Sequence, residues 1–161
     1  MKTLVVFYSL SGTTRTVAED LARVLGGELA EIRCEHYRPG FWGPLRAVLD
    51  SVRGHMPEAA MPPQSVEDYD LVVAGGPVWA SHAATPVKAF LEFAAPRLPR
   101  TALFLTHQGS ATDSAFREME RLAGQSAVAK LAARKADLEG TEYASELAEF
   151  ASLAQPETVQ D

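Results

Sequence analysis

The start of the chain changes abruptly from one apolar pattern to another, and this change constrains the fold more than any other feature. Residues 4–8, Leu-Val-Val-Phe-Tyr, are apolar without alternation, as expected of a strand buried on both faces of a parallel sheet. From Thr14 onward the apolar residues recur with a helical period, at Val17, Leu21, Val24 and Leu25. The chain is therefore predicted to begin with a strand, a short loop and a helix.

The loop between this strand and this helix is rich in hydroxyl groups. Ser9, Ser11, Thr13 and Thr14 surround Gly12. A helix N-terminus presents unpaired N–H groups and positive potential, so this loop has the donors that bind a phosphate. The alternative is an ordinary helix cap, which needs only one hydroxyl. The loop lacks the Gly-Lys-Ser/Thr of a nucleoside-triphosphate site and the three glycines of a dinucleotide fold, which weakens both of those interpretations.

Length and composition predict one globular domain over residues 1–155, with a short tail at 156–161. The chain has 161 residues, of which 47% are hydrophobic and 22% charged. One cysteine, Cys34, excludes an internal disulfide and a cysteine-based metal site, and the net charge of −6 argues against nucleic acid. No apolar run approaches the roughly 20 residues that span a membrane, and the N-terminus lacks a secretory signal pattern. We therefore expect a cytoplasmic protein without a metal and without a membrane or nucleic-acid partner, of unknown oligomeric state.

The next part of the chain is predicted to contain an edge strand and a surface helix. Residues 28–33 alternate apolar and polar, which favours a short strand. A helix is expected at 44–53, because Pro44 suits its first turn and Gly54 its end. The aromatic pair Phe41-Trp42 before it is either a lid over a ligand or an anchor beneath the helix.

A second run of apolar residues, 70–75, predicts a central strand, and the sequence Gly-Gly-Pro-Val-Trp-Ala-Ser-His at 75–82 is predicted to form the loop after it. Glycine and proline let a backbone approach a ligand closely. Trp79 is placed just past the carboxyl end of the strand, where ligands of open parallel sheets bind. The alternatives are a core tryptophan for Trp79 and a solvated loop histidine for His82.

These two stretches resemble the flavodoxin-like family. Ser9-x-Ser11-Gly12-x-Thr14 is similar to the loop in which that family holds the phosphate of FMN, and Gly75-x-Pro77-x-Trp79 is similar to the turn that passes along the flavin ring. The resemblance covers nearly the whole chain. The phosphate contacts that it implies are Ser9, Ser11, Gly12, Thr13 and Thr14. The ring contacts that it implies in the second loop are Pro77, Val78, Trp79 and Ala80.

The resemblance also implies a third ligand loop. Residues 101–106 are predicted as a strand and 113–122 as a helix, and the loop between them lies where the family closes the other side of the ring. The implied contacts there are Thr106, His107, Gln108 and Gly109. Familiar flavodoxins often place a tyrosine in this loop, and His107 and Gln108 are the nearest side chains here that are able to cover the ring.

The fold expected from these elements is a three-layer αβα domain with a five-stranded parallel sheet of order 2-1-3-4-5. Its fifth strand is placed within 125–138 on topology alone, because the composition there favours a helix. The last helix is expected at 141–153, with an inward face formed by Tyr143, Leu147, Phe150 and Leu153.

Three function classes follow, in order of preference. The first is an electron carrier that exchanges electrons with a redox partner protein through bound FMN. The second is an FMN-dependent NAD(P)H or quinone oxidoreductase that takes a small flat substrate such as a quinone. The third is a flavin-free binding module on the same fold.

Neither flavin subfamily matches completely. Carriers of low potential usually surround the flavin with carboxylates, whereas only Asp113 is acidic near these loops. Quinone reductases of this fold carry a Gly-Thr-Pro-Thr-Arg-Phe-Gly-like loop, and residues 75–82 lack its Arg-Phe pair. His107 and His82 are the candidate catalytic residues, and an imidazole beside the flavin is expected to favour two-electron transfer.

Overall fold

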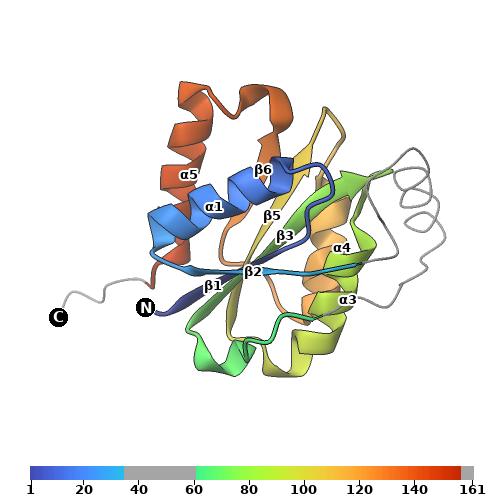
Figure 1. The fold of residues 1–161 in the computed structure, drawn as a ribbon, viewed down its shortest axis with the longest axis vertical. Coiled ribbons are helices and arrows are strands. Elements are labelled where there is room, and N and C mark those ends of the chain that lie inside the picture. Colours follow the sequence, from blue (N-terminus) through green and yellow to red (C-terminus); the bar gives the residue numbers. More distant parts are fainter. Residues whose placement is uncertain (35–60, 157–161) are drawn as a thin grey trace.

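Five parallel strands form the centre of the computed structural model, which describes residues 1–34 and 61–156 (Figure 1). In sheet order they are β2 (Glu28–Glu31), β1 (Thr3–Phe7), β3 (Leu71–Trp79), β5 (Arg100–His107) and β6 (Lys130–Arg134). The short strand β4 (His82–Ala83) pairs only with β3, and it is antiparallel. When the parallel strands alone are numbered, the predicted order 2-1-3-4-5 is confirmed.

Helices cover both faces of the sheet and complete the predicted three layers. On one face lie α1 (Thr13–Leu25) and α5 (Thr141–Ala154), and on the other lie α3 (Thr85–Ala94) and α4 (Asp113–Ala123) (Figure 1). Each pair of helices closes over its own apolar core, which we call the α1/α5 core and the α3/α4 core.

The continuous apolar run of β1 serves both cores. Leu4 and Val6 pack into the α3/α4 core, and Val5 and Phe7 pack into the α1/α5 core. All four side chains are at most 1% exposed. An alternating pattern would leave one of these faces polar, so the run reflects burial on both sides.

The alanine-rich segment expected to hold the fifth strand does so at β6. Leu131 and Ala133 are buried in the α1/α5 core, and the strand is hydrogen-bonded in parallel to β5. Small side chains fit because α5 lies directly over this strand. Pairing and burial thus outweigh the helical preference of alanine.

Three details of the expected elements are wrong. The second strand ends at Glu31, two residues early. Val24 and Leu153 do not belong to the inward faces of their helices, since they are 43% and 55% exposed. Both lie in the last turn of a helix and are exposed, whereas their neighbours Leu25 and Ala154 pack against the α1/α5 core.

Several predictions concern residues outside the described part of the chain. These are the Phe41-Trp42 aromatic pair, the helix at 44–53 and the end of the tail, 157–161. Among the helices of residues 1–34 and 61–156, none combines the length and the apolar character needed to cross a membrane.

Candidate functional site

A hollow of about 380 Å³ lies at the carboxyl ends of β1, β3 and β5. This is the point where the order of the strands reverses, because the chain leaves β1 toward α1 on one face and leaves β3 toward α3 on the other. Its size is that of a small-molecule site. Nine residues proposed from the sequence line it: Ser11, Thr13, Thr14, Pro77, Val78, Trp79, Thr106, His107 and Gln108.

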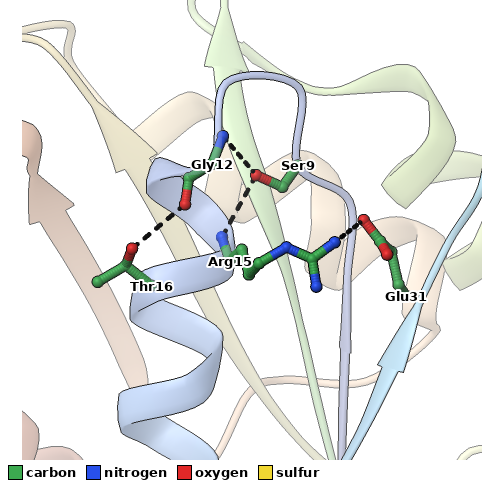
Figure 2. Close-up of polar contacts among 5 residues, drawn as sticks. All are labelled: Ser9, Gly12, Arg15, Thr16 and Glu31. Atoms are coloured by element: carbon green, nitrogen blue, oxygen red, sulfur yellow. Dashed lines mark hydrogen bonds and ion pairs between the residues drawn. The ribbon is translucent and has the colours of Figure 1, made fainter.

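Ser9 closes the first loop instead of lining the hollow. Its Oγ accepts hydrogen bonds from the N–H groups of Gly12, at 3.1 Å, and Arg15, at 3.3 Å (Figure 2). The capping role that was the alternative interpretation of the loop therefore applies to this one serine. Gly12 has a φ of 97°, a left-handed conformation that favours glycine, and it is the residue that precedes α1. The first two residues of the helix, Thr13 and Thr14, line the hollow, and their N–H groups have no partner within the helix.

A buried hydroxyl pair connects this loop to β5. Thr14 Oγ1 and Thr106 Oγ1 are 2.7 Å apart, and the two residues are 2% and 4% exposed. Each hydroxyl carries one hydrogen, and the bond between them uses one of the two. The second hydrogen is not used in this bond, and both residues line the hollow, so the structural link also carries a hydroxyl that can donate to an acceptor there.

Arg15, in the first turn of α1, is paired with an acidic residue. Arg15 Nη2 lies 2.6 Å from Glu31 Oε1, on the neighbouring edge strand β2 (Figure 2). Thr16 Oγ1 donates to the carbonyl oxygen of Gly12, at 3.3 Å, one turn further along α1 (Figure 2). Neither Arg15 nor Thr16 lines the hollow: the arginine side chain links α1 to β2, and the threonine hydroxyl links α1 to the loop.

The stretch predicted as the second ligand loop is mostly strand, because β3 continues to Trp79. The two glycines in this stretch leave room for side chains of the two cores. A Cβ on Gly75 would overlap the ring of Phe104, its partner on β5, and a Cβ on Gly76 would meet Val87 of α3. The close approach that these glycines allow is therefore made by protein side chains.

Trp79 belongs both to the α3/α4 core and to the wall of the hollow. It is 8% exposed, and its ring meets that of Tyr8 edge-on, with centroids 5.7 Å apart at 86°. Its side chain also lines the hollow beside Val78. The two interpretations weighed for this tryptophan are therefore compatible.

A two-residue turn follows Trp79 and returns the chain to β4. Ala80 and Ser81 have φ values of 48° and 67°, as in the hairpin turns that prefer asparagine and glycine. Helix α4 holds the turn, since Ser114 Oγ donates to the Ser81 carbonyl oxygen at 3.1 Å. Ala80 is exposed and does not line the hollow.

The two candidate histidines have different environments. His82 lies away from the hollow, with Nδ1 3.3 Å from Glu118 of α4, and the same carboxylate is 3.2 Å from the buried Lys88. His107 lines the hollow, and its Nδ1 accepts a hydrogen bond from the N–H of Gly109 at 3.1 Å. In that arrangement the ring proton is on Nε2, so His107 offers a donor.

Three lining residues are absent from the sequence-based set: Leu10, Ser110 and Lys135. The first two are neighbours of predicted residues. Lys135 follows the carboxyl end of β6 and begins the short helix η3 (Lys135–Asp137). The rule that ligands bind at carboxyl strand ends would have found it, had the end of the fifth strand been located.

Comparisons with known proteins agree with this architecture. No protein-family model and no curated protein sequence matches the chain. Among solved structures, a flavoprotein from Lactobacillus acidophilus NCFM in complex with FMN has a TM-score of 0.71 and 27% identity over 86% of this chain and 96% of that chain. A Bacteroides eggerthii flavoprotein gives a TM-score of 0.72 and 21% identity over 96% and 99%.

A flavodoxin is also among the similar structures. The oxidised Flavodoxin 1 of Bacillus cereus has a TM-score of 0.56 and 18% identity, covering 95% of this chain and 96% of that one. The likeness covers 96% to 99% of each of these three chains. Together with the strand order and the hollow at its switch point, it shows that this chain has the flavodoxin-like fold.

Proposed function

We propose that this chain binds FMN in the hollow and transfers electrons through the bound flavin. The proposal rests on one observation: a polar wall and an apolar wall line the same hollow. The start of α1 supplies amides and hydroxyls at Ser11, Thr13 and Thr14, and the end of β3 supplies the apolar surface of Val78 and Trp79. The similar Lactobacillus acidophilus flavoprotein, crystallised with FMN, supports this assignment.

The donors at the start of α1 suit a phosphate. Backbone N–H groups and hydroxyls bind oxyanions well, and the helix dipole adds positive potential. Among the described residues that line the hollow there is no carboxylate to repel a dianion. In the proposed complex, Thr13 and Thr14 hold the phosphate, while Trp79 and His107 flank the ring.

FMN, when bound, supplies one- and two-electron chemistry, and the protein supplies orientation and electrostatics. The proposed electron donor or acceptor is a redox partner protein or a small flat substrate such as a quinone. In the proposed complex, the Nε2–H of His107, which lines the hollow, would donate a hydrogen bond toward the ring. Trp79 excludes water from one side of the site because it is packed into the core.

The test is a comparison of FMN with riboflavin, which has the same ring and lacks the phosphate. Each charge-assisted hydrogen bond contributes about 1.5–3 kcal/mol. We therefore expect FMN to bind at least about tenfold more tightly than riboflavin, as measured by flavin fluorescence titration. Equal affinities for the two flavins would contradict the proposed phosphate site.

Trp79 provides a second prediction. Addition of FMN to the apoprotein is expected to quench tryptophan fluorescence, because a flavin in the hollow contacts this indole. The chain has two tryptophans, Trp42 and Trp79, so Trp79→Phe should remove most of the quenching and Trp42→Phe should preserve it. Quenching that persists in Trp79→Phe and disappears in Trp42→Phe would instead identify Trp42 as the contact.

An FMN-dependent oxidoreductase is the second candidate. The observation that favours it is that the ionisable side chains lining the described hollow are His107 and Lys135, which do not oppose negative charge on a reduced flavin. The discriminating measurement is steady-state oxidation of NADH or NADPH with a quinone acceptor. Turnover by the FMN-loaded protein alone supports the enzyme, and transfer only through a partner protein supports the carrier.

A further inference from the structure

We infer that Lys135 is a phosphate-binding residue of this site, so that the chain neutralises the phosphate with a cation in addition to amides and hydroxyls. The inference rests on the proposed function and adds a specificity residue to it. Lys135 is the first residue of η3, directly after β6, and it lines the hollow. It is also exposed, so its long side chain is not fixed in the core.

The alternation of β6 places Lys135 on the same side of the sheet as α1. Ala133 packs into the α1/α5 core, and Arg134 is extended, with φ −83° and ψ 129°, so the alternation continues to Lys135. On β5, Thr106 lies on that same side, because it bonds to Thr14 of α1. Lys135 therefore approaches the hollow from the face on which α1 presents its N-terminus.

The neighbouring arginines Arg15 and Arg134 are near acidic partners, whereas Lys135 is available to bind an anion. Arg15 is paired with Glu31 at 2.6 Å, and Arg134 lies 4.0 Å from Asp137. Within residues 1–34 and 61–156, Lys135 forms no ion pair. An unpaired lysine beside a hollow without lining carboxylates creates positive potential, which favours a phosphate dianion.

A lysine at this hollow has two possible partners on FMN, the phosphate and the negative edge of the reduced ring. Riboflavin separates them, since it keeps the ring and lacks the phosphate. A lysine at the phosphate affects FMN alone, whereas a lysine at the ring affects both flavins. The position of Lys135 on the α1 side favours the phosphate.

The experiment titrates FMN and riboflavin into the apoproteins of wild type, Lys135→Gln and Lys135→Arg at low and high salt. Lys135→Gln is expected to weaken FMN by about three- to tenfold, the effect of losing one partly exposed charged contact, and to change riboflavin by less than about twofold. High salt should reduce the difference between wild type and Lys135→Gln, because it screens an exposed charge. Lys135→Arg should retain most of the affinity for FMN.

The matched control is Arg134→Gln, which makes the same change of charge one position earlier, at a residue that does not line the hollow. An equal loss of FMN affinity in Arg134→Gln would show that the effect of Lys135→Gln comes only from the change in net charge, and it would overturn the inference. Equal weakening of both flavins in Lys135→Gln would place the lysine at the ring and also overturn it. Tight FMN binding that Lys135→Gln leaves unchanged refutes this inference alone, whereas wild-type protein that binds no flavin refutes the proposed function as well.

Discussion

Gly75→Ala is expected to lower the free energy of unfolding by about 3 kcal/mol, the cost of overpacking a closed core. The new Cβ would overlap the ring of Phe104, which is completely buried and paired with Gly75 across β3 and β5. Phe104 is packed into the α1/α5 core, so its ring yields only by displacing its neighbours. Urea denaturation followed by circular dichroism measures the loss.

Two variants test whether the clash is the cause. Gly124→Ala introduces a Cβ that meets nothing within 4 Å, at a φ of 70°, so it should cost only the roughly 1–2 kcal/mol of a left-handed alanine. Phe104→Leu removes part of the obstructing ring. If the clash is responsible, Gly75→Ala combined with Phe104→Leu will be more stable than the sum of the two separate effects predicts. Additive losses would argue against it.

Thr14→Val is expected to reduce FMN affinity by at least about tenfold and to destabilise the protein by about 1–3 kcal/mol. Valine has the shape of threonine without its hydroxyl, so the loss isolates one polar atom. It removes one hydroxyl of the pair beside the hollow and leaves the buried hydroxyl of Thr106 without its 2.7 Å partner. Denaturation and flavin titration measure the two effects separately.

The double variant Thr14→Val with Thr106→Val separates folding from binding. When both members of a buried pair become apolar with the same shape, no polar atom is left without a partner, and stability is nearly restored. The FMN affinity should stay low, because both hydroxyl donors are absent. Recovery of FMN affinity together with stability would show that the pair acts only as a structural link.

The central strands β1, β3 and β5 were predictable because continuous apolar runs indicate burial on both faces. Residues 4–8 are the clearest case, since both cores require apolar side chains from one strand. The order of the strands followed from the resemblance of two loops to one family. The fifth strand had no local signal, because an alanine-rich segment becomes a strand only through its pairing with β5.

The errors near the site come from contacts between distant residues. Gly75, Gly76 and Pro77 suggest a loop locally, yet they continue β3, since the glycines make room for Phe104 and Val87. His82 pairs with Glu118, which lies 36 positions later in the chain. No pattern of neighbouring residues reveals such partners.

The turn at Ala80 and Ser81 also has a consequence for the order of folding. Two successive residues in left-handed conformations without a glycine are unfavourable in an isolated hairpin. Helix α4 compensates through Ser114 and Glu118, which bond to Ser81 and His82. The hairpin that follows Trp79 is therefore expected to form only after α4 has docked, late in folding. Val78 and Trp79, which line the hollow, pair with Ala83 and His82 across this turn. A nascent or partly unfolded chain would then lack the ordered end of β3 at the hollow, which would restrict the proposed flavin binding to chains that have completed the α3/α4 core.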